Sequence, residues 1–264
     1  MADTRRPLAG QTALVTGGSR GIGAAIADAL AADGASLWIT GRNETVLAAV
    51  AADLARRHDV PVRHARCDVT APQDIDALAA AIGTACPRLE ILVNNAGAAD
   101  SIAFDKLDEG FWQRMLDTNL TSVYRVGRAL LPLLRRAEDG ARIVNVASTA
   151  GLVGFPYVTA YCAAKHGVVG LTRALAAELA RDGITVNAVC PGYTDTELVD
   201  QAVATITAKT GMNASRARDG LIANVPIGRY IRPAEVAAAV RWLCQAEAAG
   251  VTGTAIPIAG GAVT

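Results

Sequence analysis

The chain has 264 residues, of which 52% are hydrophobic, and its basic and acidic side chains are equal in number at 25 each. This length is typical of one α/β domain, and the apolar share is large enough to fill a sizeable core. The zero net charge excludes the basic face that binds nucleic acid or anionic membranes, and no apolar run reaches the roughly 18 residues of a membrane span.

Short β-branched runs alternate with alanine-rich helical stretches along the chain. Helices are predicted through about residue 32, from 43 to about 57, and from Pro72, a residue that favours a first helical turn. Continuously apolar strands that alternate with helices indicate a parallel sheet covered on both faces. We therefore predict one α/β domain over residues 1–264, a doubly wound Rossmann fold with a seven-stranded parallel sheet. The predicted strands are 12–16, 36–40, 61–67, 89–94, 142–146, 184–190 and 254–258.

Residues 193–232 break this rhythm, because they separate a strand from the next clear helix. A long excursion in a compact domain is more often functional than idle. It follows a strand at the edge where such folds bind ligands. We predict a substrate lid whose helical middle, residues 201–222, is interrupted by a candidate hinge at residues 210–213.

Residues 16–23, with the sequence TGGSRGIG, lie between the first predicted strand and the first predicted helix. Glycines there let the backbone approach a pyrophosphate, and the helix N-terminus adds free N–H groups and a partial positive charge. The spacing Gly-x3-Gly-x-Gly differs from the common G-x-G-x-x-G fingerprint, so the position after the first strand carries the argument. We predict a dinucleotide-binding loop.

The end of the second predicted strand indicates which dinucleotide binds. An acidic residue there binds the ribose hydroxyls of NAD, whereas an arginine accommodates the 2′-phosphate of NADP. The strand is followed by Gly41, Arg42 and Asn43, with no carboxylate. Arg42 and Arg20 carry planar guanidinium groups that bind phosphate well, although a solvated loop charge is the alternative role for Arg42. We predict NADP(H) in preference to NAD(H).

The five cysteines are widely spaced and form no CxxC pair, which indicates reduced thiols in a reducing compartment. The three histidines show no ligand spacing, so no metal site is predicted. The first eight residues, MADTRRPL, lack the apolar stretch of a signal peptide. We expect a cytoplasmic protein.

Tyr161 and Lys165 open a long predicted helix and, being four residues apart, share one of its faces. A free tyrosine has a pKa of about 10, too high for acid–base work at neutral pH, and a nearby ammonium favours the phenolate. Ser148 follows a predicted strand at the ligand-binding edge, where its hydroxyl can hydrogen-bond a reacting carbonyl. On its own, a tyrosine and a lysine at this spacing usually make a surface contact, and a serine at the end of a strand usually caps a helix.

These motifs occur together and in one order, and the set resembles the short-chain dehydrogenase/reductase family. The resemblance runs from about Leu8 to the C-terminus, and the thirteen-residue step from Ser148 to Tyr161 matches the usual step of the family. It implies an enzyme that interconverts a ketone and a secondary alcohol with a nicotinamide cofactor. The motifs are TGGSRGIG at 16–23, NNAG at 94–97, Asn119, Ser148, Tyr161 with Lys165, and Pro191-Gly192.

The resemblance assigns a role to each matched catalytic residue. Tyr161 is the general acid/base, and Ser148 orients the carbonyl. Lys165 lowers the pKa of the tyrosine and binds the nicotinamide ribose, while Asn119 holds a water of the proton relay. A metabolite sensor that has lost catalysis would normally lack Tyr161 or Lys165, and both are present.

The resemblance also implies a set of cofactor-binding residues. Asp68 and Val69 match the pair that contacts adenine, although Asp68 read alone is a turn or cap residue. Thr196 falls at the position expected to meet the carboxamide. The full set is Gly17, Ser19, Arg20, Gly21, Ile22, Gly23, Arg42, Asp68, Val69, Asn95, Ala96, Gly97, Tyr161, Lys165, Pro191, Gly192, Thr194 and Thr196.

Residues 186–192 (VNAVCPG) and 225–230 (VPIGRY) are similar to the 3-oxoacyl-thioester branch of the family. That branch includes fatty-acid and aromatic-polyketide ketoreductases and 3-hydroxyacyl-CoA dehydrogenases. The implied reaction is reduction of a 3-oxoacyl thioester by NADPH. A 3-hydroxyacyl-CoA dehydrogenase, or a sugar, steroid or small-alcohol dehydrogenase that uses NAD, is the alternative.

The carrier of the thioester, CoA or acyl carrier protein, stays open. Arg135, Arg136 and Arg181 lie where a basic patch would meet a carrier protein, but Glu138 and Asp182 occupy positions where arginines are expected. In the predicted lid, Lys209, Arg216 and Arg218 offer positive charge to the phosphates of CoA or a phosphopantetheine arm, with solvated charge as the alternative. The resemblance implies a homotetramer, in which helices around 119–134 and 159–180 pair across a two-fold axis.

Overall fold

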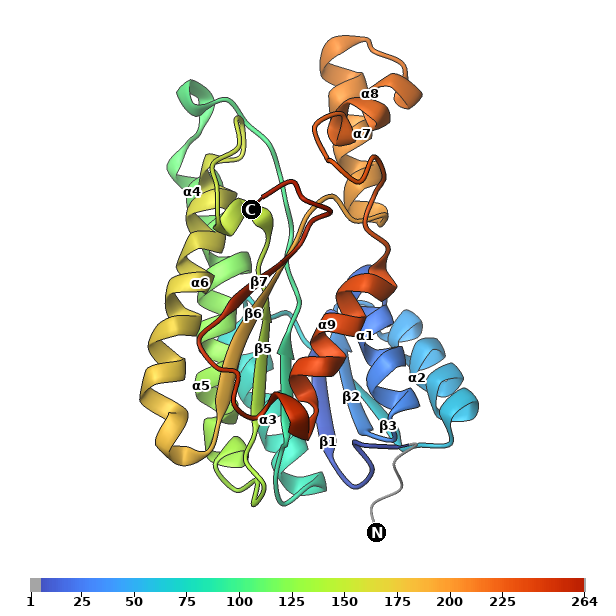
Figure 1. Ribbon diagram of the computed structural model, residues 1–264, viewed down its shortest axis with the longest axis vertical. Coiled ribbons are helices and arrows are strands. Elements are labelled where there is room, and N and C mark those ends of the chain that lie inside the picture. The colour runs from blue at the N-terminus through green and yellow to red at the C-terminus, as the bar shows by residue number, and fades with distance from the viewer. Residues whose placement is uncertain (1–5, 264) are drawn as a thin grey trace.

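The computed structural model describes residues 6–263; residues 1–5, part of the segment expected to lack a signal peptide, and Thr264 lie outside the described residues. One sheet runs through the molecule, and its strands are all parallel in the order β3-β2-β1-β4-β5-β6-β7 (Figure 1). The predicted seven-stranded, doubly wound fold is confirmed. The strands are β1 (Thr12–Thr16), β2 (Ser36–Gly41), β3 (Val62–Arg66), β4 (Ile91–Asn94), β5 (Arg142–Val146), β6 (Thr185–Pro191) and β7 (Ala255–Ile258).

Helices cover both faces of the sheet, as the alternating pattern requires (Figure 1). One face carries α1 (Gly21–Ala32), α2 (Glu44–His58) and α9 (Pro233–Cys244), and the other carries α3 (Pro72–Ala85), α5 (Ser122–Leu134) and α6 (Thr159–Leu179). The remaining helices are α4 (Glu109–Leu116), α7 (Glu197–Thr210) and α8 (Ala214–Ile222). Among residues 6–263, no helix has the length and apolar character that crossing a membrane requires.

Two apolar cores lie on opposite sides of the sheet because successive strand residues point to opposite faces. In β1, Ala13 and Val15 pack toward α1 and α9, whereas Leu14 packs toward α3 and α5. All three side chains are fully buried. A strand buried on both faces is apolar at most positions, which explains the nearly continuous apolar runs in the sequence.

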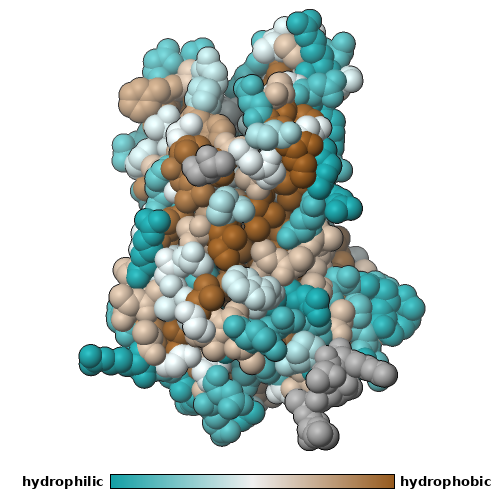
Figure 2. Space-filling view, in the orientation of Figure 1, coloured by the Kyte–Doolittle hydropathy of each residue, from teal (hydrophilic) through white to brown (hydrophobic). Residues whose placement is uncertain are grey.

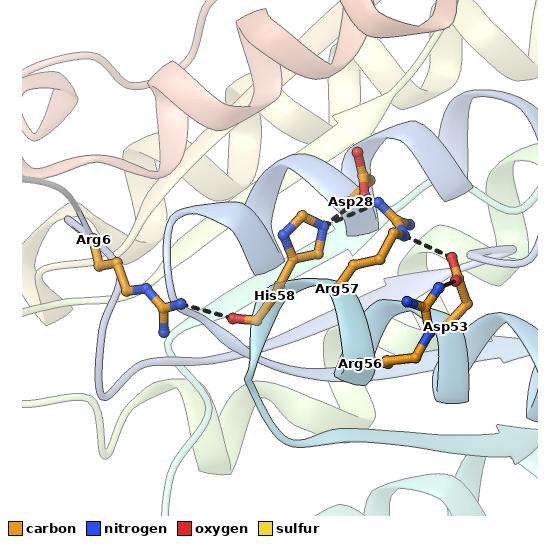
Figure 3. Close-up of polar contacts among 6 residues, drawn as sticks. All are labelled: Arg6, Asp28, Asp53, Arg56, Arg57 and His58. Atoms are coloured by element: carbon orange, nitrogen blue, oxygen red, sulfur yellow. Dashed lines mark hydrogen bonds and ion pairs between the residues drawn. The ribbon is translucent and has the colours of Figure 1, made fainter.

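Polar contacts fasten α1 to the C-terminal end of α2, away from the carboxyl edge of the sheet (Figure 3). Asp28 of α1 accepts from Arg57 and lies 2.7 Å from Nε2 of His58. Arg57 also donates to Asp53 at 2.6 Å, and Arg6 donates to the backbone oxygen of His58 at 2.8 Å. This network braces the helix layer and contributes no side chain to the carboxyl edge.

Candidate active site

The structure brings Ser148, Tyr161 and Lys165 together at the carboxyl ends of β5 and β6. Ser148 follows β5, and the other two lie in the first turns of α6. The Ser148 hydroxyl accepts from the Ala150 N–H at 3.1 Å, so it caps the short turn that follows the strand. The same hydroxyl forms a hydrogen bond with the Tyr161 phenol. The cap and the active-site serine are therefore one residue.

Burial controls the ionisation of Tyr161. It raises the pKa of the phenol to about 12, and the hydrogen bond with Ser148 is the contribution that lowers this pKa. The phenol is consequently protonated at neutral pH. A protonated phenol has a proton to give to an oxygen that develops negative charge beside it.

Lys165 is buried, and its Nζ donates to the backbone oxygen of Val146 at 2.9 Å. Burial lowers the pKa of this ammonium to about 8. We expected Lys165 to lower the pKa of Tyr161, but in this structure burial of the phenol dominates. The ammonium lies 5.7 Å from the centroid of the tyrosine ring and is bonded to the β5 backbone, not to the phenol.

Asn119 lies in a π-helical turn, Asp117–Thr121, between α4 and α5. Its side chain is fully buried; Nδ2 donates to the Met115 oxygen at 3.1 Å, and Oδ1 accepts from the Ala98 N–H at 3.1 Å. A Cβ atom on Gly97 would lie 2.9 Å from this Oδ1 and 3.7 Å from Nζ of Lys165. Asn119 and Lys165 therefore flank the same glycine. Single π turns within α-helices are frequent at functional sites.

The glycine loop between β1 and α1 has the shape that a pyrophosphate needs. Gly17 has a φ of +64°, which favours glycine, and a Cβ on Gly23 would lie 2.1 Å from the Gly17 oxygen. No side chain caps the N-terminus of α1, and within residues 6–263 the N–H groups of Gly21 and Ile22 have no hydrogen-bond partner. Free N–H groups at a helix N-terminus bind phosphate. The loop therefore fits a dinucleotide.

Thr16 opens the predicted dinucleotide-binding loop, but the sequence assigned it no role of its own. Its Oγ1 accepts from the N–H groups of Asn95 and Ala96 at 2.9 and 3.1 Å, while Asn95 Nδ2 donates to the Thr16 oxygen at 2.9 Å. These bonds tie the end of β1 to the end of β4 and fix the floor of the glycine loop. A hydroxyl residue directly before the glycines was the available signal.

The two arginines proposed for the cofactor phosphate have different surroundings. Arg42, after β2, is exposed and forms no ion pair within the described residues. It lies near Asp68, whose pKa is lowered chiefly by hydrogen bonds from Thr70 and further by Arg42. Arg20, by contrast, is paired with Glu197, the first residue of α7. Of these two arginines, Arg42 is the one that has no ion-paired carboxylate among residues 6–263.

Sequence and structure comparisons place the chain among known proteins. A family model described as short chain dehydrogenase matches residues 11–207. The chain belongs to the short-chain dehydrogenase family. It is 40% identical to a putative ketoacyl reductase of Streptomyces coelicolor, over 95% of this chain and 96% of that protein. It is also 37% identical to a 3-oxoacyl-[acyl-carrier-protein] reductase of Vibrio harveyi, over 96% of this chain and 98% of that protein.

A solved structure of an actinorhodin polyketide ketoreductase with NADPH is similar to this chain at a TM-score of 0.90 and 40% identity, covering 96% of this chain and 97% of the other. These findings make the protein a short-chain dehydrogenase with ketoacyl reductase relatives, an oxidoreductase that uses a nicotinamide cofactor and reduces a ketone. The glycine loop and uncapped α1 described above fit such a cofactor.

In this short-chain dehydrogenase the loop after β6 lies over the glycine loop. A Cβ on Gly21 would lie 3.3 Å from Cγ2 of Thr196, and Thr194 Oγ1 donates to the Gly192 oxygen at 3.0 Å. Pro191 ends β6, and a Cβ on Gly192 would lie 3.2 Å from Ala259. Thr196, predicted to meet the carboxamide, thus lies against the glycine loop.

The segment predicted as a lid is a packed helical hairpin, α7 and α8. Its apolar side chains form a small core of their own: Val199, Val203, Ile206, Met212, Ala217, Leu221 and Tyr230. The predicted hinge is the turn of this hairpin, since Gly211 ends α7 with a φ of +70° and Asn213 caps α8. Arg218 is not free for a substrate phosphate, because it pairs with Asp195 and Asp200.

Proposed function

We propose that the protein reduces a 3-oxoacyl thioester to the 3-hydroxyacyl thioester with NADPH. The observation that supports this most directly is the grouping of Ser148, Tyr161 and Lys165 beside the glycine loop at one edge of the sheet. A nicotinamide cofactor bound at the glycine loop would supply the hydride for the carbonyl carbon. Ser148 holds the carbonyl oxygen, and Tyr161 gives its proton to that oxygen as the alkoxide forms.

Lys165 and Asn119 complete the proposed proton path. The buried ammonium of Lys165 binds the nicotinamide ribose and stabilises the phenolate that remains after Tyr161 has lost its proton. Asn119 holds a water close to Lys165, because its carboxamide flanks Gly97 together with the ammonium. That water returns a proton from solvent to Tyr161 for the next cycle.

A substrate panel tests the proposed reaction. Purified enzyme is assayed with a 3-oxoacyl-CoA, a decalone that mimics a cyclic polyketide, and a sugar, each with NADPH and NADH. We expect the 3-oxoacyl-CoA with NADPH to give the highest kcat/KM. Turnover of the sugar alone, or preference for NADH, contradicts the proposal and favours the NAD-dependent alternative.

Arg42 is proposed to bind the 2′-phosphate of NADPH. We expect Arg42→Asp to weaken NADPH binding at least about tenfold, because a charge-assisted hydrogen bond contributes about 1.5–3 kcal/mol and the new carboxylate repels the phosphate. Fluorescence titration with NADPH and NADH measures this change. Arg181→Asp, an exposed arginine beyond the end of α6, is the matched control. Equal loss of NADPH and NADH affinity in Arg42→Asp would contradict the assignment.

We also propose a homotetramer. The helices α5 and α6 are the expected pair at one two-fold interface, and Gly127 and Gly170 have open space where a Cβ would stand. Apolar side chains also gather beside β7 in Figure 2, and Trp242 of α9 is 43% exposed; exposed apolar patches mark protein interfaces. Light scattering should give four times the 27.1-kDa chain mass.

A further inference from the structure

Above the carboxyl edge of the sheet, the side chain of Lys209 connects the α7–α8 hairpin to the loop that follows β4. Nζ of Lys209, in the last turn of α7, donates to the backbone oxygen of Ser101 at 3.1 Å. Ser101 lies in the loop after β4, three residues beyond Ala98, which donates to Asn119. The α7–α8 hairpin stands on one side and this loop on the other (Figure 1), and the surface is hollowed between the two (Figure 2).

Among the described residues Lys209 has no carboxylate partner, whereas three arginines of the 193–232 segment have one. Arg218 pairs with Asp195 and with Asp200, the latter at 2.6 Å. Arg229 and Arg232 both pair with Glu235, at 2.8 and 3.4 Å. Lys209 is exposed, and its only polar partner within residues 6–263 is the Ser101 carbonyl. A carbonyl orients an ammonium without cancelling its charge, so this cation stays available to an anion in the hollow.

The helix places this cation away from the glycine loop, which lies at the same edge of the sheet as Tyr161. Glu197, at the start of α7, pairs with Arg20 of the glycine loop. Lys209 is twelve residues further along the same helix, which corresponds to roughly 18 Å at 1.5 Å per residue. A substrate whose carbonyl meets Tyr161 therefore passes Lys209 only if it is long. Thioesters of 4′-phosphopantetheine are long, and their arm ends in a phosphate.

We propose that Lys209 binds the phosphate at the end of the pantetheine arm and thereby selects arm-linked thioesters over shorter ketones. This inference rests on the proposed thioester reduction. The ammonium leaves the Ser101 carbonyl for the phosphate, exchanging a neutral acceptor for a charged one and gaining a stronger hydrogen bond. Because CoA and acyl carrier protein share this phosphate, the site serves either carrier.

Three acetoacetyl thioesters separate the parts of the arm: those of CoA, of 4′-phosphopantetheine, and of N-acetylcysteamine, which has no phosphate. We expect Lys209→Gln to raise KM about three- to tenfold for the first two, and to leave KM for the third and kcat for all three unchanged. Lys209→Arg should retain the wild-type KM values. Arg216→Gln, another exposed cation of the hairpin, is the matched control. The wild-type KM for the two phosphate esters should also rise with ionic strength.

The other possible outcomes of this assay each contradict one part of the proposal. An equal rise in KM for all three thioesters in Lys209→Gln means that the lysine only tethers the hairpin to the Ser101 loop. A rise for the CoA ester alone means that it binds the 3′-phosphate of CoA and not the arm. No change overturns the inference outright. Wild-type enzyme that turns over none of the three thioesters contradicts the proposed function instead.

Discussion

Tyr161→Phe is expected to lower kcat by about 10²- to 10⁴-fold, the range that a general acid contributes, while NADPH binding is retained. The substitution keeps the ring, so packing at the start of α6 is preserved, and it removes only the hydroxyl that bonds with Ser148. Single-turnover reduction followed at the NADPH absorbance measures the rate, and fluorescence titration measures the binding. Tyr124→Phe, an exposed tyrosine of α5, is the control for loss of a hydroxyl.

A Tyr161→Phe enzyme that keeps more than about a tenth of the wild-type rate would show that another group donates the proton.

The raised pKa of Tyr161, about 12, also predicts how the oxidation rate depends on pH. Reduction needs the protonated phenol, which is present at neutral pH. Oxidation needs the phenolate, whose population grows as pH rises toward that value. The oxidation rate should therefore increase with pH across the range in which the fold survives.

Lys165→Met should lower kcat/KM at least about tenfold, because the variant loses the only ammonium beside Tyr161 among the described residues and, by our proposal, the ribose contact. It should also change how stability depends on pH. In the folded protein the pKa of Lys165 is lowered from 10.5 to about 8 by burial. Between these two values the unfolded chain binds more protons than the folded one. The free energy of unfolding contributed by Lys165 therefore rises with pH in that window.

This stability effect is measured as a difference. Urea unfolding of the wild type and of Lys165→Met is compared at pH values below and above this window. As the pH rises through the window, the free energy of unfolding of the wild type should increase by up to roughly 3 kcal/mol relative to that of the variant. Below the folded pKa the lysine is charged in both states, so its desolvation cost is constant there. Parallel pH profiles for the two proteins would show that the ammonium is solvated and that its pKa is ordinary.

The local hydrophobic pattern of the sequence was sufficient to predict the features that depend on residues close together in the chain. The bounds of β1 and β5 were predicted residue for residue, because strands buried on both faces are predominantly apolar. The position of Ser148 after β5 and of Tyr161 and Lys165 on one helix follow from the same local periods. The fold class needed nothing more than the alternation of such elements.

Contacts between distant segments were beyond the reach of those patterns. No sequence pattern indicates that Arg20 pairs with Glu197, or that Lys165 donates a hydrogen bond to the backbone oxygen of Val146. The predicted hinge at residues 210–213 forms the turn of a helical hairpin that has its own core, a contact set that the sequence pattern did not indicate. Glycine in the left-handed region ends a helix as readily as it permits motion, and only the packing on either side distinguishes the two.

The π turn at Asn119 has a consequence for how this helix tolerates insertions and deletions. α4, the turn and α5 form one continuous rod from Glu109 to Leu134, and a π turn is equivalent to one residue too many for regular winding. Deleting that residue would regularise the backbone and leave the faces of α4 and α5 in place, because the extra residue is taken up within this one turn, but it would shift the residues of the turn itself. The carboxamide of Asn119 would leave Gly97. A regular helix would therefore need one residue fewer between Glu109 and Leu134, whereas the position of the Asn119 amide requires the extra residue.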